Sequence, residues 1–370
     1  MLSFYRRYLL PGFVFQSIVI GGGYGTGREL VEFFLGEGPL GGYLGMLVAT
    51  VIWGVILALS FELARAGRFF DYRTFLNSLL GRGWIAFEVL YVLQVILTVA
   101  VVGSASGELL FETLGWPRIA GTLIMVAVVG LFTFWGSGLI ERFFAVWSLG
   151  LYVVYFIVIV LVWNNSGDTI LSNMTVSVPD SAWFIAGIKY AAYNLAALPA
   201  MLFALRHLEH RREAFGAGMM AGVIAMVPGV LIYTTFLGYY PSIASEAIPA
   251  NFVLGQLGMP LFQIFFQIVL FGTFIETGTG MIHGFNERIA GVMAERGRTM
   301  SHWLRLGVAG GLLIGAIFLA EQFGLITLIS KGYGLTTWAF WILFLLPIIV
   351  VGSYRIFPTL FTTSTQPDKE

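Results

Sequence analysis

The feature that most constrains this chain is a run of glycine inside an apolar segment. Residues 21–27 read Gly-Gly-Gly-Tyr-Gly-Thr-Gly, with apolar sequence on both sides, at 9–20 and 30–35. Because glycine costs roughly 1 kcal/mol per residue against alanine in a helix interior, we expect the helix to open here. Inside a bilayer an opened backbone survives only where protein or water satisfies its polar groups. The run therefore predicts a binding site at mid-membrane depth.

Close helix packing is the alternative explanation for these glycines, since small residues let membrane helices approach one another. Packing motifs place glycines four residues apart on one face, whereas five glycines in seven residues cover every face. The pattern therefore favours a broken helix. Its freed carbonyls can hold a cation, and the N-terminus of its second half can hold an anionic group.

The composition indicates an integral membrane protein. The chain is 58% hydrophobic and 11% charged, with a mean hydropathy of +0.86, whereas a soluble domain carries about 25% charged residues. The absence of cysteine excludes disulfides, thiolate metal sites and cysteine nucleophiles. The four histidines make no metal-ligand spacing, no basic tract suggests nucleic acid, and no nucleophile motif or cofactor loop suggests an enzyme. The expected partners are the lipid bilayer and a small molecule, and the oligomeric state stays open.

Apolar stretches of about 20 residues, the length that crosses a bilayer, recur along the whole chain. We expect a single all-α transmembrane domain over 1–357, followed by a polar cytoplasmic tail at 358–370. Ten spans are predicted, at 8–35 (broken), 40–64, 84–111, 117–137, 141–163, 181–206 (interrupted), 214–240, 258–288, 302–321 and 324–353.

Basic residues indicate the orientation, because loops on the cytoplasmic side carry an excess of Lys and Arg. With ten crossings the basic residues of the flanking segments fall on one side, and the opposite loops at 164–180 and 241–258 contain no Lys or Arg. Both termini are therefore predicted to be cytoplasmic. The basic residues are Arg6, Arg7, Arg65, Arg68, Arg73, Arg82, Arg142, Arg206, Arg211, Arg212, Arg288, Arg296, Arg298, Arg305, Arg355 and Lys369.

A second interruption lies five spans after the first, at residues 193–199. Pro199 removes a helix hydrogen bond there, and Asn194 can cap the opened backbone. A lone proline kink is often only structural. However, five spans per half give inverted halves, here about 8–163 and 181–353, and paired interruptions in such halves mark the binding site of secondary transporters.

With these features the chain resembles the LeuT-fold transporters of the amino acid–polyamine–organocation and sodium–neurotransmitter symporter superfamily. The architecture resemblance covers essentially the whole chain, and residues 21–34 resemble the opening of the bacterial YkvI-like membrane proteins. The resemblance implies a 5+5 inverted repeat with broken helices 1 and 6, a hub of spans one, three, six and eight, and a place in the bacterial cytoplasmic membrane. It implies no substrate.

The resemblance also implies a sodium site between the break of span one and span eight. Relatives place span-eight ligands at i, i+3 and i+4, and Thr273, Glu276 and Thr277 have this spacing on one helical face. The matching span-one carbonyls are those of Gly21 and Tyr24. Carbonyl, hydroxyl and carboxylate oxygens suit a hard cation.

Two departures from the relatives bear on coupling. Glu276 stands where relatives have a hydroxyl, so it either binds sodium or carries a proton instead. Gly22 occupies the place of an asparagine that serves a second sodium in the neurotransmitter symporters, which argues against a second ion of that type. No further cofactor is expected.

The substrate site is predicted beside the two breaks. The half-helix that starts near Thr26 offers N–H donors to a substrate carboxylate, and span three carries a polar stripe that includes Tyr91 and Gln94. Interhelical hydrogen bonds worth about 0.6 kcal/mol each explain the stripe nearly as well. The candidate substrate-binding residues are Gly22, Gly23, Gly25, Thr26, Gly27, Tyr91, Gln94, Tyr193 and Asn194.

Charged residues within spans cost at least about 2.5–3.5 kcal/mol on insertion scales, so they are usually functional or paired. Glu276 is the strongest functional candidate, with a buried cation partner as the alternative. The candidate gating or pathway residues are Arg28, Glu29, Glu32 and Lys189. Arg28 either pairs with Glu32, gates the outer pathway or meets a substrate carboxylate. Lys189 either reaches the outer interface or lines the pocket.

These features predict a cation-coupled secondary transporter, a symporter in which sodium is favoured over a proton as the coupling ion. Its expected solute is a small polar organic molecule such as an amino acid, a related zwitterion or a carboxylate. The expected mechanism is alternating access, in which spans one, two, six and seven rock against the rest. A solute-sensing receptor on the same scaffold and a uniporter or channel are the alternatives. The sequence leaves the substrate, the coupling ion, its stoichiometry and symport versus antiport open.

Overall fold

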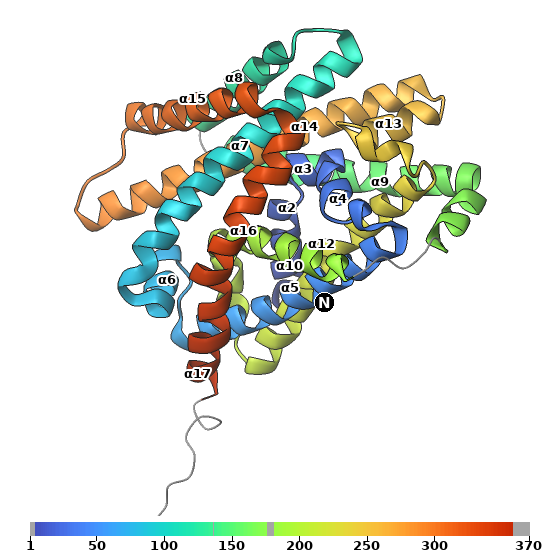
Figure 1. Ribbon diagram of the computed structural model, residues 1–370. Helices are drawn as coiled ribbons and strands as arrows, with labels where there is room; N and C mark the ends of the chain where they lie inside the picture. The colour runs from blue at the N-terminus through green and yellow to red at the C-terminus, as the bar shows by residue number, and fades with distance from the viewer. Residues whose placement is uncertain (1–3, 136, 176–180, 358–370) are drawn as a thin grey trace, which may run out of the picture.

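The computed structural model describes residues 4–135, 137–175 and 181–357, and within these ranges it contains helices and no strand (Figure 1). The α-helices are α2 (Leu10–Val19), α3 (Gly22–Thr26), α4 (Arg28–Phe33), α5 (Pro39–Gly67), α6 (Tyr72–Leu80), α7 (Trp84–Leu114), α8 (Arg118–Trp135), α9 (Ser137–Met174), α10 (Ala182–Asn194), α11 (Leu198–Met201), α12 (Arg211–Leu237), α13 (Pro249–Gln256), α14 (Pro260–Glu295), α15 (His302–Thr327), α16 (Gly334–Phe340) and α17 (Ser353–Ile356). Short 3₁₀ and π turns are η1 (Tyr5–Leu9), η2 (Leu35–Glu37), η3 (Gly81–Gly83), η4 (Leu195–Ala197), η5 (Leu202–His207), η6 (Ser242–Ser245), η7 (Leu328–Tyr333), η8 (Trp341–Leu345) and η9 (Ile348–Gly352).

The described helices are consistent with the ten predicted spans. Segments long and apolar enough to cross a membrane are 39–67, 72–114, 152–174, 182–207, 211–237, 260–294 and 302–356, and a shorter apolar helix covers 118–134. The segment 302–356 contains predicted spans nine and ten, which meet at a non-helical Gly324 (φ 67°, ψ 169°). Predicted span one is divided into short helices.

Predicted span one is broken where its glycines lie. Between α2 and α3 the backbone of Gly21 is extended (φ −106°, ψ −159°), and between α3 and α4 Gly27 is left-handed (φ 79°). A β-carbon at Gly27 would overlap the Phe236 ring as well as strain the backbone, so only glycine fits there. The Thr26 hydroxyl accepts a hydrogen bond from the N–H of Arg28, the first residue of α4, at 3.2 Å. The break expected from the sequence is confirmed.

The interruption of predicted span six is milder. After α10 the chain tightens into the 3₁₀ turn η4, α11 and a second 3₁₀ turn, η5, while every residue at these junctions keeps right-handed helical dihedral angles. The Asn194 side chain donates to the Tyr190 carbonyl at 3.0 Å, within the preceding turn. The second helix is therefore narrowed at its interruption, whereas the first is opened.

The helices α2, α5, α10 and α12, which correspond to predicted spans one, two, six and seven, form one packed bundle. α12 packs against both α5 and α2, and α10 packs against α5. Small residues bring α5 and α12 together: a β-carbon at Gly218 would overlap the backbone of Ala58, and one at Gly222 would lie 2.7 Å from the Gly54 nitrogen. On the other side of the molecule α7 packs against α8, α14 and α15 (Figure 1).

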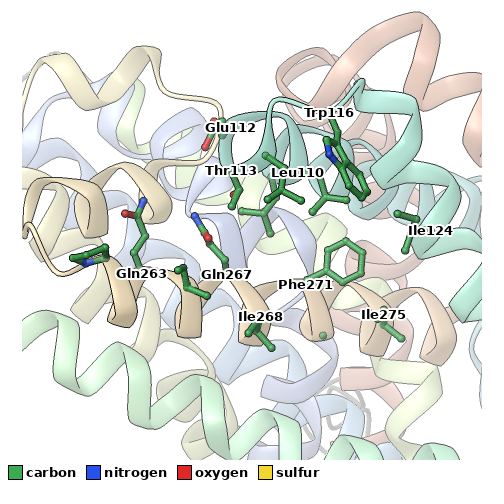
Figure 2. A pocket seen from close by; sticks show the side chains of 15 residues that line it. Leu110, Glu112, Thr113, Trp116, Ile124, Gln263, Gln267, Ile268, Phe271 and Ile275 are labelled. Carbon is green, nitrogen blue, oxygen red and sulfur yellow. The ribbon is translucent and has the colours of Figure 1, made fainter.

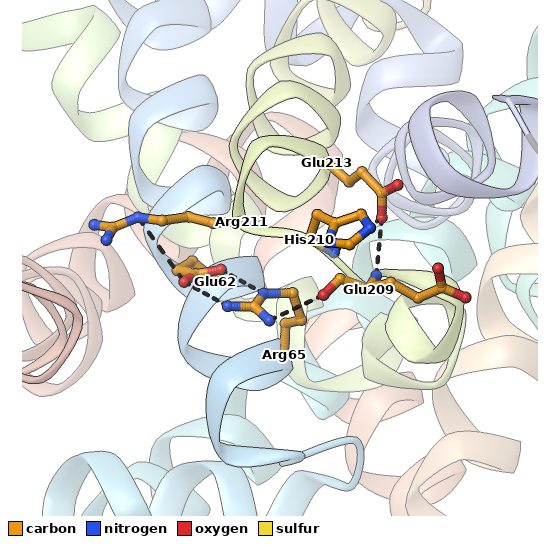
Figure 3. A network of polar contacts seen from close by, with 6 residues as sticks. All are labelled: Glu62, Arg65, Glu209, His210, Arg211 and Glu213. Carbon is orange, nitrogen blue, oxygen red and sulfur yellow. Dashed lines mark hydrogen bonds and ion pairs between the residues drawn. The ribbon is translucent and has the colours of Figure 1, made fainter.

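A polar network joins the ends of the bundle helices (Figure 3). Arg65 of α5 binds Glu62 through two guanidinium nitrogens, at 2.7 and 2.8 Å, and donates to the Glu209 carbonyl at 3.1 Å. The Glu209 N–H donates to Glu213 of α12 at 2.9 Å. Arg7, which precedes α2, pairs with Glu209 at 2.8 Å and with Glu213 at 2.6 Å. These contacts fix the relative positions of the three helix ends.

We call this end of the molecule, which carries Arg7, Arg65 and Arg211, the arginine-rich end, and the other the opposite end. Arg118 is an exception to the predicted distribution of basic residues. It begins α8 at the opposite end, where it pairs with Glu108 of α7. Because the Glu108 carboxylate neutralises Arg118, this arginine adds no net positive charge to the opposite end.

Candidate functional site at the helix breaks

A central cavity of about 50 Å³ lies beside the break of predicted span one. Its walls come from α2 and the break itself, from α4, α7, α14 and η7, and from the interruption of predicted span six. The residues that line it are Ile18, Val19, Gly21, Gly22, Glu29, Tyr91, Gln94, Thr98, Tyr193, Asn194, Ala196, Ala197, Ala200, Thr277, Met281 and Tyr333.

Five of the nine predicted substrate-binding residues line this cavity, namely Gly22, Tyr91, Gln94, Tyr193 and Asn194. The other four, Gly23, Gly25, Thr26 and Gly27, lie behind it and shape the break. The Gly25 carbonyl accepts a hydrogen bond from the Tyr155 hydroxyl at 2.8 Å. Gly27 forms the turn before α4, and Thr26 accepts from the first N–H of that helix. The cavity wall therefore contains part of the predicted substrate-binding segment, and the remaining residues of that segment form the break beside it.

Glu29 lies in the cavity wall and is 4% exposed. Its Oε2 accepts a hydrogen bond from the Tyr193 hydroxyl at 2.7 Å. A β-carbon at Gly23 would overlap the Glu29 carboxylate, so this glycine makes the room that the carboxylate occupies. Among the described residues no Lys or Arg nitrogen lies within 4.0 Å of the carboxylate. The sequence grouped Glu29 with the gate, and the fold turns it toward the cavity.

Two further groups in the wall have notable surroundings. The Gln94 side chain is 4% exposed and its Oε1 has no hydrogen-bond partner, while its Nε2 lies 3.5 Å from the Thr98 hydroxyl. Tyr333, which the sequence did not predict, stacks on Tyr193 with ring centroids 4.5 Å apart and 14° between the planes. The cavity therefore combines a carboxylate, an unpaired amide oxygen and a pair of aromatic rings.

The residues of the predicted sodium site come together in part. A β-carbon at Gly21 would lie 3.3 Å from the Thr277 hydroxyl oxygen, and one at Gly25 would lie 3.8 Å from a Thr273 methyl group. The break of predicted span one therefore packs on α14 at the level of these two threonines.

The two carbonyls predicted as ligands each accept one backbone hydrogen bond. The Gly21 carbonyl accepts from the Gly25 N–H at 2.7 Å, and the Tyr24 carbonyl accepts from the Gly27 N–H at 2.9 Å. A carbonyl oxygen has two lone pairs, so each retains capacity for a cation. The Tyr24 side chain points away from this place, since its hydroxyl donates to the Ala225 carbonyl at 3.2 Å.

Glu276 is 7% exposed and lies one residue before Thr277, but only Thr277 is part of the cavity wall. Glu276 interacts electrostatically with Tyr152 of α9. Among the described residues no group of three or more His, Asp or Glu side chains is placed to hold a metal ion. A cation at the break would therefore depend on backbone carbonyls and hydroxyls as well as on this single carboxylate.

Arg28 closes the opposite end of the site. Its guanidinium donates to the carbonyls of Ala244 and Glu246 at 2.8 and 2.9 Å and pairs with Glu32 at 3.0 Å, and the residue is 6% exposed. It therefore ties α4 to the loop around η6 instead of entering the cavity. Lys189, the other gating candidate, is half-buried on α10 and is not part of the cavity wall.

At the arginine-rich end a vestibule of about 800 Å³ adjoins the central cavity and shares Tyr91 and Ala200 with it. One wall comes from predicted span six, with Pro199, Ala200 and Phe203, and the other from α7 and α14. Within it Arg288 of α14 pairs with Glu88 of α7 and lies over the Tyr72 ring at 4.0 Å from the centroid.

A third cavity, of about 820 Å³, lies between α7, α8 and α14 near the opposite end (Figure 2). Its wall is mostly apolar, with a polar chain at one side in which Asn251 donates to Glu112 at 2.7 Å and accepts from Gln267 at 2.9 Å. It shares no residue with the central cavity. Its size alone does not make it the candidate site, because neither helix break reaches it.

No family model matches the chain. A curated relative is an uncharacterized membrane protein, YkvI, of Bacillus subtilis (strain 168), which is 23% identical over 333 residues, or 86% of this chain and 93% of the relative. The similarity to a YkvI-like protein expected from residues 21–34 is confirmed.

Three solved structures resemble the chain, each at 14% sequence identity. They are MhsT in complex with L-phenylalanine (TM-score 0.60, covering 95% of this chain and 97% of that one), Mhp1 in an inward-facing conformation (0.58, 95% and 77%) and a manganese transporter of Eremococcus coleocola in complex with an aromatic bis-isothiourea substituted compound (0.52, 98% and 89%). These structures have the LeuT fold. The chain has this fold too, as its two interrupted helices predicted.

Proposed function

Starting from the LeuT fold, we propose that this protein is a secondary transporter that carries a small polar organic solute across a bacterial cytoplasmic membrane, coupled to a cation. In this proposal residues 1–357 form a single transport domain with inverted halves at about 8–163 and 181–353, and both termini face the cytoplasm. The polar tail predicted at 358–370 lies outside the described residues. One observation carries the proposal. The cavity at the helix breaks adjoins a vestibule at the arginine-rich end, whereas Arg28 closes the opposite end.

Alternating access follows from the position of the vestibule. Pro199 of α11 and Phe203 of η5 continue predicted span six, which belongs to the bundle through α10, whereas Trp84 and Arg288 in the facing wall belong to α7 and α14. The vestibule therefore separates the bundle from the rest of the molecule. The polar network at the ends of α5 and α12 and the close packing of these helices support movement of the bundle as one body. Rocking it toward α7 and α14 closes the vestibule and opens the opposite end.

The coupling ion in this proposal is sodium, held by the carbonyls of Gly21 and Tyr24, the hydroxyls of Thr273 and Thr277 and the carboxylate of Glu276. The packing of Gly21 against Thr277 supports it, because an ion there bridges predicted spans one and eight. The bridge favours one of the two conformations, which is what coupling requires. A proton carried by Glu276 is the competing form of the same mechanism.

Uptake into proteoliposomes tests the function. The purified full-length chain is reconstituted, and accumulation of radiolabelled amino acids and small carboxylates is measured under a sodium gradient, a pH gradient or neither. We expect saturable accumulation that an ionophore for the coupling ion abolishes. Single-channel conductance without accumulation would identify a channel. Solute binding without any uptake would identify a receptor.

A further inference from the structure

Among the described residues, the wall of the central cavity has one acidic group and no basic one. Glu29 is the one Lys, Arg, His, Asp or Glu residue among the described residues of its wall. Burial of a carboxylate without a cation partner is costly. Tyr193 supplies one hydrogen bond to Oε2, and the adjacent Arg28 is turned to the loop at 244–246. The cavity thus holds a carboxyl group without a cation partner among the described residues, and a bound cation would stabilise it as a carboxylate.

A second acceptor in the same wall lacks a donor. Buried polar atoms almost always have a hydrogen-bond partner, yet Gln94 Oε1 has none and its residue is 4% exposed. Gln94 lies on α7 and Glu29 on α4, so the two oxygens reach the cavity from different helices. A ligand that donates hydrogen bonds would satisfy both.

The aromatic wall also favours a cation. The stacked rings of Tyr193 and Tyr333 stand in the cavity, and the faces of aromatic rings attract ammonium groups. The Tyr193 hydroxyl also orients the Glu29 carboxylate by the hydrogen bond that it donates to Oε2. The cavity measures about 50 Å³, whereas pockets for drug-sized ligands measure roughly 300–1,000 Å³. It therefore has room for one end of a solute, with the remainder extending past Tyr91 and Ala200 into the vestibule.

We propose that the central cavity binds the ammonium group of a primary amine between the Glu29 carboxylate and Gln94 Oε1, beside the rings of Tyr193 and Tyr333. An ammonium group has three N–H donors and no acceptor, which matches a wall that offers acceptors. An amino acid qualifies through its ammonium group, whereas an organic acid without one is repelled by Glu29. The inference rests on the proposed transport function only for the claim that the bound amine is carried.

The first experiment compares matched ligands on the purified full-length protein, by thermal unfolding and equilibrium binding. The ligands form triads on the side chains of alanine, leucine and phenylalanine: the amino acid, the amine without its carboxylate, and the acid without its amine. We expect at least one amine and its amino acid to raise Tm in proportion to occupancy, with the matching acid inactive. Trimethylation of that amine should weaken binding, since it removes every N–H donor. Stabilisation by acids alone, or by no primary amine at millimolar concentration, would overturn the proposal.

The second experiment uses variants of the two acceptors. Glu29→Gln should weaken binding of the active amine by about 30-fold or more, because a charged partner is lost, while Glu321→Gln, on the exposed face of α15, should leave it unchanged. The oxygen and nitrogen of a glutamine amide can exchange places with little change in shape. Gln94→Glu puts an oxygen at both positions, so it tests whether an acceptor at residue 94 supports amine binding. We expect Gln94→Glu to retain amine binding and Gln94→Leu to weaken it. Wild-type affinity in both Glu29→Gln and Gln94→Leu would show that neither side chain binds the amine, and would overturn the proposal.

Folding is checked on the ligand-free variants. Glu29→Gln keeps a group that can accept from Tyr193 and removes an unpaired charge, so its Tm without ligand should not fall. If this variant does not fold, Gln94→Glu and Gln94→Leu decide the question on their own.

Proteoliposome uptake distinguishes failure of the ammonium site from failure of the proposed transport function. Binding of amines that depends on Glu29, without any uptake, would overturn the proposed transport function and leave the ammonium site intact. Uptake of a solute that lacks an amine, at the same rate in Glu29→Gln as in the wild type, would overturn the ammonium site and leave the transport function intact.

Discussion

The two ends of the central cavity are built differently. At the opposite end a single buried guanidinium, that of Arg28, binds two loop carbonyls and Glu32. At the arginine-rich end the walls stand apart around a vestibule of about 800 Å³, where Arg288 pairs with Glu88 on the same side of the gap. The closed end thus depends on a few directional hydrogen bonds, and the open end on the separation of two packed bodies. A transition between conformations would break few contacts at one end while changing packing at the other.

The largest expected effect comes from the proposed ion site, because the ion there would couple the closed end of the pathway to the open one. Glu276→Gln should reduce cation-coupled uptake about 30-fold or more, because loss of a charged ligand costs about 2–5 kcal/mol. Uptake is measured across a range of sodium concentration and pH, with Glu321→Gln as the matched control. Uptake like that of the wild type throughout this range would remove Glu276 from the coupling mechanism.

The next effect concerns the closed end. The chain contains no cysteine, so Ala200→Cys provides a single reporter that lies in the wall of both the cavity and the vestibule. We expect a membrane-impermeant thiol reagent to label it from the arginine-rich side. Adding Arg28→Gln should raise labelling from the opposite side by about tenfold, since each lost hydrogen bond to the charged group is worth about 1.5–3 kcal/mol. Arg296→Gln, on an exposed turn, is the control. Equal labelling with and without Arg28 would show that this arginine does not hold the end closed.

A smaller effect tests the bundle as one body. Gly218→Ala should lower stability by about 1–3 kcal/mol, because its β-carbon would overlap the Ala58 backbone of α5. Gly310→Ala is matched in chemistry but has open space around it, so its better helix propensity should stabilise by up to about 1 kcal/mol. Thermal unfolding in detergent gives both values. Similar results for the two variants would argue against close packing of α5 and α12.

The smallest effect is expected at the polar network of the arginine-rich end. Arg7→Gln removes ion pairs with the exposed Glu209 and the buried Glu213. Glu213 keeps its hydrogen bonds from the Glu209 and His210 N–H groups, and ion pairs of a partly exposed arginine contribute little and are screened by salt. Tm should fall by less than in Gly218→Ala, and the difference from the wild type should shrink at high salt. Arg6→Gln is the exposed control. A decrease in Tm that persists at high salt would mean that Arg7 is held by more than ion pairs.

The sequence predicted the break of span one because its cause is local: five glycines in residues 21–27 weaken the helix, and Gly27 adopts the left-handed conformation that glycine readily allows. The contact of Gly27 with the Phe236 ring is tertiary and could not be predicted. How far the helix opens at the second interruption, at residues 193–199, was harder to predict from the sequence. Pro199 falls in the first turn of α11, where the N–H that proline lacks is not needed, so the helix tightens and does not open.

Other parts of the site depended on tertiary geometry. Tyr91 and Gln94 were found because they lie on one face of a regular helix, α7. Glu29 was assigned to the gate, since helical periodicity does not carry across the left-handed turn at Gly27 and so does not tell which way the next helix faces. Tyr333 ends the π turn η7, whose i→i+5 hydrogen bonds put more residues into one turn and so shift the face that a regular helix would present.

Two short helices were missed for a different reason. α6 and α13 are too short to give a membrane-span signal, although Asp71 accepts a hydrogen bond from the Thr74 N–H at 2.9 Å and marks the start of α6. This cap was visible in the sequence as a helix start signal. A search for caps in the connecting segments would have found the helix that supplies Tyr72 to the vestibule.

The five-residue helix α3 is bounded at both ends by glycine, with an extended residue before it and a left-handed one after it. Such a piece acts as a link with two pivots. Changes in the backbone dihedral angles of Gly27 can accommodate a tilt of α4, and those of Gly21 a shift of α2. The two halves of the membrane helix can therefore move independently. α3, beside the central cavity, can thereby stay packed on α14 while the helices on either side of it tilt.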